Sequence, residues 1–261
     1  MMPEDLRNRI KLIIEIHFND WGGTPDRLTP TWIENRLALF MKYTRKSLQL
    51  QTSQDFSCYV LYDPASERTI REVLDRYAPL PNNIRFVPPR AYHAQVAKDI
   101  ADYHRFYRVY LSSDDMYHKE FIRKLRTWTP KKETLALVPQ YGYVYDSVQH
   151  RLGKFFFWLP SYGATIHDVG KYLKGQEPKL TWRDALKVPH EFIHLKEPIW
   201  INHIHAYNTG ISFDKVRSWT IRGVQDACDV EPWTNSRQIK ACFGPEITGP
   251  NPIKRVLSDF F

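Results

Sequence analysis

Residues 106–115 read Phe-Tyr-Arg-Val-Tyr-Leu-Ser-Ser-Asp-Asp. The first six are rich in aromatic and β-branched side chains, which favour a strand. Two serines and two acids follow at once, so the predicted strand ends next to the carboxylates of Asp114 and Asp115. A strand that runs directly into a polar turn is typical of α/β folds, in which ligands bind beyond the carboxyl ends of the strands.

The chain before this stretch alternates between the two periodicities of secondary structure. A β-branched run at 11–17 predicts a strand, and apolar residues at helical spacing from Thr31 to Leu48 predict a helix. Further strands are predicted at 56–62 and 84–87, and further helices at 66–77 and 91–104. Strands and helices that alternate in this way predict βαβ units, and therefore an α/β fold with a mostly parallel central sheet flanked by helices.

The second half of the chain has a less regular pattern. Strands are predicted at 134–139, 141–145 and 154–158, whereas the stretch from about Asp214 mixes Gly, Pro and Trp and receives no assignment. No repeat or low-complexity linker divides the sequence. We therefore predict a single domain over residues 1–261, in two halves at 11–128 and 129–261, the second with a C-terminal extension.

The composition is that of a globular protein, with 43% hydrophobic and 25% charged residues. A formal net charge of +8 suits phosphorylated substrates or an anionic membrane surface. No dense basic run occurs, so we expect no nucleic-acid partner. Three widely spaced cysteines, no signal sequence and no long apolar segment predict a cytoplasmic protein whose membrane contact, if any, is peripheral.

The acidic pair has two interpretations. Carboxylates at the ligand-binding edge of a sheet suit Mg²⁺ or Mn²⁺ on a diphosphate, because one or two protein carboxylates are enough when phosphate and water complete the coordination. Alternatively, Asp114 and Asp115 cap a helix that begins near Tyr117, since Asp is a favoured N-cap residue.

Four motifs, one of which contains this pair, are spread along the chain. An Arg-x-x-Leu-Phe segment starts at Arg36, and a Ser-Leu-x-x-Gln-Thr segment starts at Ser47. Ser-Ser-Asp-Asp stands at 112–115, and Trp-Ile-Asn-His-Ile-His-Ala-Tyr-Asn stands at 200–208. These motifs resemble those of the rhamnosyltransferase family of bacterial and viral glycosyltransferases, in scattered form over most of residues 11–212. The family pattern has an acid where this chain has Ser112.

The resemblance implies a GT-A (nucleotide-diphospho-sugar transferase) fold, with 11–128 binding the nucleotide sugar and 129–261 facing the acceptor. It implies that Asp63 receives the nucleotide base, and that Asp115 and Asp114 hold the metal and the ribose-diphosphate. His205 becomes a further metal ligand or phosphate contact, and Arg36 a candidate for the nucleotide site. Because Ser112 replaces an acid, Arg and Lys side chains are the alternative means of neutralising the diphosphate.

A second motif, His190-Glu191-Phe192-Ile193-His194, matches the zinc-protease pattern H-E-x-x-H. On a helix, the two histidines would lie one turn apart and Glu191 would be the general base. The metzincin extension is missing, however, and Pro189 and Pro198 leave room for only about two helical turns.

In a transferase the same glutamate has another use. An inverting enzyme needs a carboxylate to deprotonate the acceptor hydroxyl. Glu191 is the first candidate for this base, Asp168 the second and Asp146 the third.

The sequence therefore predicts an inverting, metal-dependent glycosyltransferase that acts in polysaccharide or glycan synthesis. Its donor is expected to carry a hexosyl group, such as rhamnosyl. Its expected partners are a nucleotide-diphosphate sugar and a glycan or lipid-linked acceptor. No Gly-x-Ser-x-Gly elbow, Gly-x-Gly-x-x-Gly fingerprint or P-loop occurs. Two alternatives remain: a zinc-dependent hydrolase that uses His190, Glu191 and His194, and a non-catalytic relative that binds sugar nucleotides.

Overall fold

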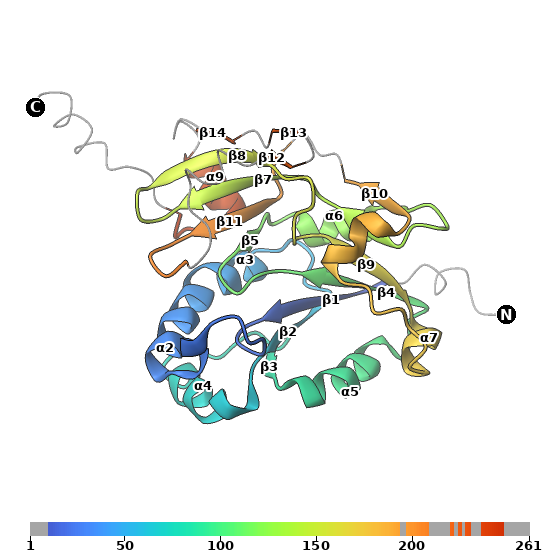
Figure 1. The fold of residues 1–261 in the computed structure, drawn as a ribbon, viewed down its shortest axis with the longest axis horizontal. Helices are drawn as coiled ribbons and strands as arrows, with labels where there is room; N and C mark the ends of the chain where they lie inside the picture. Colours follow the sequence, from blue (N-terminus) through green and yellow to red (C-terminus); the bar gives the residue numbers. More distant parts are fainter. Residues whose placement is uncertain are drawn as a thin grey trace, which may run out of the picture.

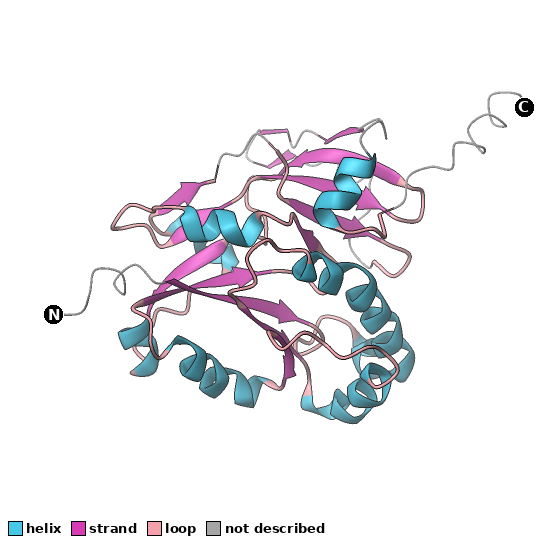
Figure 2. Ribbon diagram, turned by 180° about the vertical axis from the view of Figure 1, so that it is seen from behind, coloured by secondary structure: helices cyan, strands magenta, loops and turns pink. Residues whose placement is uncertain are grey.

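The computed structural model describes residues 10–193, 197–208, 220–221, 224–225, 228–230 and 236–247. Two sheets dominate this part of the chain (Figure 1). A seven-stranded sheet has the order β10-β6-β9-β4-β1-β2-β3, and a five-stranded sheet has the order β14-β8-β7-β11-β5. Helices flank the larger sheet, as the view from behind also shows (Figure 2).

The larger sheet is built around the strands that the sequence predicted. β1 (Ile10–His17) lies between β2 (Ser57–Leu61) and β4 (Arg105–Tyr110), parallel to both, and β3 (Ile84–Val87) follows beyond β2. β6 (Ala136–Val138), β9 (Ala164–Asp168) and β10 (His190–Phe192) complete it. In this sheet β9 alone is antiparallel to its neighbours. The predicted α/β fold with a mixed, largely parallel sheet is therefore confirmed.

Apolar side chains of the central strands alternate between the two faces of this sheet. Leu12 and Ile14 of β1 pack into one core with residues of α2 (Pro30–Leu39) and α4 (Glu67–Leu74). Ile13 faces the other way and packs with α5 (Pro89–Ile100) and α7 (Val169–Leu173). Helices therefore cover both faces, as the three consecutive buried apolar residues 12–14 of β1 require.

The long helix predicted from Thr31 is present in three consecutive segments. Thr29 accepts a hydrogen bond from the amide of Trp32 and caps α2, and the chain continues through a π-helical turn, η2 (Phe40–Thr44), into α3 (Arg45–Gln49). The remaining helical elements are η1 (Pro25–Leu28), η3 (Pro64–Ser66), α6 (Phe121–Thr127), η4 (Trp182–Lys187) and α9 (Ser236–Phe243).

The strand order creates a switch point at β1. From β1 the chain moves outward to β2 and β3, and then returns to place β4 on the opposite side of β1. The loops that leave β1 and β4 therefore run in opposite directions, and a crevice forms between them at the carboxyl ends of these strands.

The second sheet brings distant segments against the turn after β4. It contains β5 (Met116–Tyr117), β7 (Tyr141–Asp146), β8 (Arg151–Phe156), β11 (Trp200–Ile204) and β14 (Cys228–Val230). β11 pairs with β5, so that Trp200 lies opposite Tyr117. Since residues 116–117 form a strand and the next helix begins at Phe121, the interpretation of Asp114 and Asp115 as helix caps is wrong.

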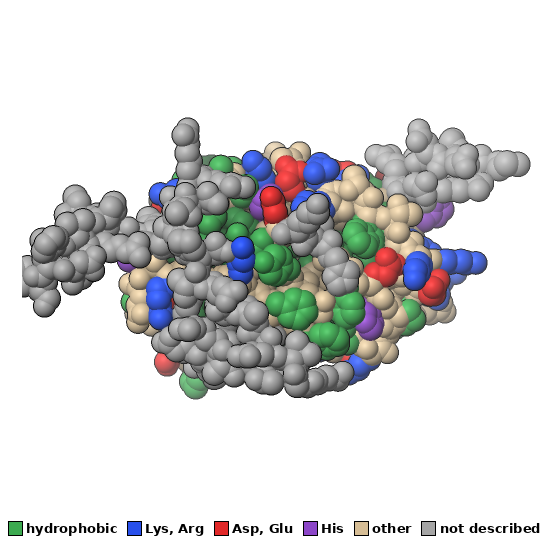
Figure 3. Space-filling model, turned by 90° about the horizontal axis from the view of Figure 1, so that it is seen from above, with side chains coloured by type: hydrophobic (Ala, Val, Ile, Leu, Met, Phe, Trp, Pro, Cys, Tyr) green, Lys and Arg blue, Asp and Glu red, His purple; other side chains and the backbone are tan. Residues whose placement is uncertain are grey.

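The described helices include none that is long and apolar enough to cross a membrane. On the face shown in Figure 3, Lys and Arg side chains stand at separate places and next to acidic ones. The small two-stranded sheet of β12 (Thr220–Ile221) and β13 (Val224–Gln225) completes the described strands.

Candidate donor-binding site

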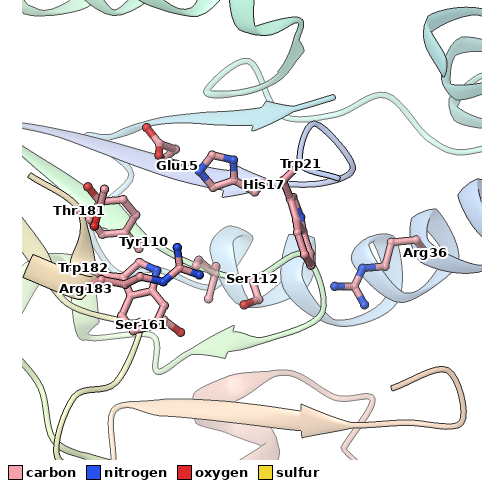
Figure 4. A pocket seen from close by; sticks show the side chains of 11 residues that line it. Glu15, His17, Trp21, Arg36, Tyr110, Ser112, Ser161, Thr181, Trp182 and Arg183 are labelled. Atoms are coloured by element: carbon pink, nitrogen blue, oxygen red, sulfur yellow. Dashed lines mark hydrogen bonds and ion pairs between the residues drawn. The ribbon is translucent and has the colours of Figure 1, made fainter. Parts of the chain in front are cut away.

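A cavity of about 370 Å³ opens at the switch point (Figure 4). The end of β1 contributes Glu15 and His17, and the end of β4 contributes Tyr110, Leu111 and Ser112. Its other lining residues are Trp21, Arg36, Ser161, Thr181, Trp182 and Arg183. A cavity of this size at the carboxyl ends of parallel strands is the expected ligand site of such a sheet.

Glu15 and His17 form an ion pair that lines this cavity. His17 Nε2 lies 3.0 Å from Glu15 Oε1, and His17 Nδ1 lies 2.8 Å from Asp20 Oδ2. Burial alone would lower the pKa of His17, but the two carboxylates outweigh it and raise the pKa to about 10. His17 is therefore an imidazolium at neutral pH, and Glu15, whose pKa is lowered by His17 and Arg108 against the effect of its burial, is a carboxylate.

Two arginines give the cavity further positive charge. Arg36 comes from α2 and lines the cavity, and its guanidinium also donates to Asp114. Arg183 is exposed in η4, where its guanidinium carbon lies 5.0 Å from the ring centroid of Trp182. Among the described residues Arg183 has no ion-pair partner within 4.0 Å, so its charge is available to a ligand.

Asp114 is hydrogen-bonded to the guanidinium of Arg36 and to the imidazole of His205. Its Oδ2 and Oδ1 accept hydrogen bonds from Arg36 Nη1 and Nη2 at 2.9 and 3.2 Å, and Arg36 Nε donates to Ser113 Oγ at 2.7 Å. His205 Nε2 lies 2.8 Å from Asp114 Oδ2. Although burial raises the pKa of Asp114, the charge of Arg36 and the hydrogen bond from His205 lower it to about 2.

Asp115 faces away from Arg36, into a second set of donors. Oδ2 accepts a hydrogen bond from the hydroxyl of Tyr162 at 2.8 Å, and Oδ1 accepts one from the amide of His203 at 2.8 Å. Asn202 Nδ2 lies 3.3 Å from Oδ1. Burial and the neighbouring charge of Asp114 raise the pKa of Asp115 to about 7.

The histidines of β11 and the following turn are fixed by their hydrogen bonds. The amide of Tyr207 donates to His205 Nδ1 at 3.1 Å, so this nitrogen carries no proton. A neutral imidazole has one N–H group, and Nε2 therefore carries the proton and donates it to Asp114. Arg36 Nη1, 3.5 Å from the same Nε2, is then a neighbouring donor and not a partner.

Part of the chain matches a known protein family. Residues 26–155, about half of the chain, match the family described as "Putative rhamnosyl transferase". The chain belongs to this family. The predicted enzyme class, a glycosyltransferase, is thereby confirmed. The matched residues of this rhamnosyltransferase-family chain include Arg36, Asp63 and the acidic pair.

Two solved structures show more distant similarity. An active-site mutant of LgtC is 12% identical, with a TM-score of 0.34 over 70% of this chain and 72% of that one. The 4-diphosphocytidyl-2C-methyl-D-erythritol synthase from Anaerococcus prevotii is 12% identical, with a TM-score of 0.30 over 82% of this chain and 96% of that one. No curated protein matches the sequence significantly.

The side chains predicted to hold Mn²⁺ or Mg²⁺, those of Asp114, Asp115 and His205, do lie together, but they already have partners. Each carboxylate oxygen accepts at least one hydrogen bond, and Nε2 of His205 is protonated. The charge of Asp114 is already paired with the guanidinium of Arg36, which would repel a divalent cation at the same carboxylate. Within the described ranges, no three His, Cys, Asp or Glu side chains form a group that could hold a metal ion without ligands from the diphosphate. As arranged, these residues do not fit a divalent cation, and we derive no chemical step through one.

Asp63, predicted to receive the nucleotide base, lies at the carboxyl end of β2 but does not line the cavity. Its Oδ2 pairs with Arg27 Nη2 at 2.9 Å, and its Oδ1 accepts the amide of Ala65 at 3.0 Å and so caps η3. In this arrangement the carboxylate stabilises the loop after β2.

The predicted catalytic bases lie elsewhere. Asp168 ends β9, opposite Arg105 at the beginning of β4, and caps α7 through the amide of Lys171. Because β9 is antiparallel, its end lies at the edge of the sheet away from the cavity, so Asp168 is not placed to act as the base. Asp146 is 3% exposed and holds the turn between β7 and β8 through Arg151.

The H-E-x-x-H segment does not have the shape that a zinc site needs. His190–Phe192 form an edge strand, β10, paired with β6, and not a helix. The Glu191 carboxylate accepts hydrogen bonds from the amide of Lys131 at 2.7 Å and from Trp128 Nε1 at 3.2 Å, in addition to the Thr134 hydroxyl. Glu191 also does not line the cavity. His194 lies outside the described residues.

Sequence reasoning missed most of the cavity. Glu15, His17, Trp21, Trp182 and Arg183 were not predicted as site residues. A usable signal exists for the first two, because a Glu and a His interrupt the apolar strand at 11–17 on the same face as Ile13. For the others the sequence contains no pattern, since η4 reaches the cavity only through the tertiary fold.

Proposed function

We propose that this chain transfers a sugar from a nucleotide-diphosphate donor to an acceptor hydroxyl, with the donor bound in the cavity at the switch point. The observation that carries the proposal is the position of Arg36. This residue of the family motif lines the cavity and also holds Asp114, so the motif and the crevice meet at one side chain. Membership of a rhamnosyltransferase family supports a sugar nucleotide as the ligand.

The lining residues match the parts of such a donor. Arginine side chains are suited to phosphate oxygens, since their planar N–H groups can bind two oxygens at once. The rings of Trp21 and Trp182 offer flat faces to a base or a sugar. Glu15, ionised and 8% exposed, is an acceptor for ribose or sugar hydroxyls.

Three finer parts of the proposal rest on the resemblance of the sequence. They are inversion at the anomeric carbon, a rhamnosyl or other hexosyl donor, and a glycan or lipid-linked acceptor. Contact with an anionic membrane surface rests instead on the formal net charge of +8. Inversion is measured by NMR, as the anomeric configuration of the product made from a donor of known configuration.

The test of the proposal is a binding and turnover panel. Wild-type protein is titrated calorimetrically with UDP-, dTDP- and GDP-linked sugars, and release of nucleoside diphosphate is followed with added acceptor sugars. We expect one nucleotide class to bind and to be turned over. Failure of every sugar nucleotide to bind would refute the proposal, and binding without turnover on any acceptor would favour the non-catalytic relative.

A steric variant locates the binding site. Ser112→Trp and Ser161→Trp each place a large side chain in the cavity, and we expect each to abolish donor binding. Ala101→Trp is the matched control, because Ala101 is exposed at the end of α5 and does not line the cavity. Thermal unfolding of all three variants identifies any that fails to fold. If both serine variants fold and bind donor normally, the donor binds elsewhere.

A further inference from the structure

The arrangement of Asp114 and Asp115 raises the question of which cation neutralises the charge of a bound diphosphate. Asp114 and Asp115 are 5% and 2% exposed, and the oxygens of both are occupied by Arg36, His205, Tyr162, Asn202 and a backbone amide. A cation that bridges the diphosphate to Asp114 would lie beside the guanidinium of Arg36, and the two positive charges would repel each other.

Arg36 occupies the place that such a cation would take between the cavity and Asp114. It brings positive charge to the carboxylate, and its side chain is still 20% exposed. A guanidinium has five N–H groups. Three of them are used by Ser113 and Asp114, so that others on the two terminal nitrogens remain for phosphate oxygens.

Arg36 is also held in position before any ligand arrives. Bonds from Nε to Ser113 and from both terminal nitrogens to Asp114 fix the plane of the guanidinium. In the view of Figure 4, Arg36 and Arg183 lie on opposite sides of the cavity, with Ser112 between them. A diphosphate over Ser112 would thus lie between two cations.

We infer that Arg36 and Arg183 bind the diphosphate of the donor directly, and that no divalent cation bridges it to Asp114 or Asp115. The inference rests on the proposed function, since it requires a nucleotide-diphosphate donor in this cavity. In this arrangement the role of Asp114 is to position Arg36. Ser112, where the family pattern has an acid, leaves the space between the two arginines without a third carboxylate.

The first experiment is calorimetric titration of the wild-type protein with UDP, dTDP and GDP, once with excess EDTA and once with MnCl₂. The expected result is a Kd for one of them that is the same in both buffers within about threefold, a difference of about 0.6 kcal/mol. Binding that appears only with manganese would overturn the inference while leaving the proposed function intact. No binding in either buffer would remove the proposed function itself.

The second experiment tests the arginines in EDTA. Arg183→Met is expected to weaken diphosphate binding roughly 10-fold, and Arg36→Met roughly 10- to 100-fold, as for hydrogen bonds to charged groups. Arg68→Met is the control, because Arg68 is exposed on α4 and pairs with Glu72. Since Arg36→Met leaves Asp114 unpaired, the double variant Arg36→Met/Asp114→Asn is measured beside it. Unchanged affinity in Arg183→Met and in the double variant would overturn the assignment.

A third variant separates positioning from metal binding. Asp114→Asn retains a hydrogen-bond acceptor for Arg36 but removes its charge, so we expect affinity in EDTA to fall by less than about 10-fold. Added manganese should not change this affinity. A manganese-dependent rise of affinity in wild type that disappears in Asp114→Asn would show that this carboxylate is a metal ligand.

Discussion

The guanidinium of Arg36 donates to both carboxylate oxygens of Asp114, at 2.9 and 3.2 Å, although 78 residues separate the two in the chain. Arg36 lies on α2 and Asp114 follows β4, so the contact depends on the packing of that helix against the sheet. It joins the two parts of the family motif into one site. Removal of one partner from a buried ion pair leaves an uncompensated charge, so both side chains matter for folding.

Asp115 predicts a pH dependence of stability. Its pKa is raised to about 7 in the folded protein, above the ordinary aspartate value of about 4. Between these values the folded state binds more protons than the unfolded state, so the free energy of unfolding falls as the pH rises from about 4 to 7. Asp115→Asn should remove this decline and raise the free energy of unfolding at pH 8, on the order of 1–4 kcal/mol.

The measurement is urea unfolding of wild type and Asp115→Asn at several pH values from 2 to 8. Asp114→Asn is the control of opposite sign, because the pKa of Asp114 is lowered to about 2. Its contribution to stability is present above about pH 4 and is lost as the pH falls toward 2. If wild type and Asp115→Asn show parallel pH profiles, the raised pKa of Asp115 is wrong.

Gly142 predicts a second effect on stability. A Cβ atom at this position of β7 would lie 2.1 Å from the ring of Trp200, which is completely buried and donates to the carbonyl of Pro139 at 2.7 Å. Gly142→Ala should therefore lower the free energy of unfolding by about 1–3 kcal/mol, as overpacked cores do. Gly22→Ala is the control, since a Cβ there meets nothing within 4 Å. Equal unfolding midpoints of the two variants would contradict this packing.

The strands β1 to β4 and the helices α2, α4 and α5 could be predicted because their signals are local. A β-branched run or a helical spacing of apolar residues is complete within about ten residues. β9 could not be predicted in this way. Its sequence, Ala-Thr-Ile-His-Asp, gives no sign that it inserts between β4 and β6 or that it runs antiparallel to them.

The same limit explains the site residues. Asp114 was predicted because it directly follows a strand, and the carboxyl ends of parallel strands meet at one edge. Asp168 also follows a strand, but its antiparallel direction places it at the other edge. The clamp of Asp114 by His205 depends on the pairing of β11 with β5, which joins segments more than 80 residues apart. No local pattern encodes such a contact.

Glu191 yields a prediction that contrasts with its expected catalytic role. Because its carboxylate is bonded to the 128–134 segment, Glu191→Gln should leave kcat and donor affinity unchanged. It should lower the free energy of unfolding by about 1 kcal/mol, since an amide has one acceptor oxygen in place of two. Turnover and urea unfolding of the same preparation decide this. A fall of kcat by roughly 10²–10⁴ with unchanged stability would restore Glu191 as the general base.

Gly23 controls the position of Trp21 at the cavity. A Cβ atom on Gly23 would lie 1.6 Å from an atom of the Trp21 ring, so the ring rests directly on the glycine. Trp21 is 55% exposed, and a flexible exposed side chain can move aside at little cost. Gly23→Ala should therefore displace the ring and leave the unfolding midpoint nearly unchanged.

If the ring packs on the donor, affinity for the nucleotide sugar should fall roughly 5- to 10-fold, as expected for loss of one aromatic contact of about 1 kcal/mol. Trp21→Ala should weaken binding by a similar factor, and the double variant should be no weaker than either single one, because both changes remove the same contact. Gly22→Ala, with open space around its Cβ, should bind as wild type does. Additive losses in the double variant would show that Gly23 acts on the ligand by a route other than the tryptophan ring.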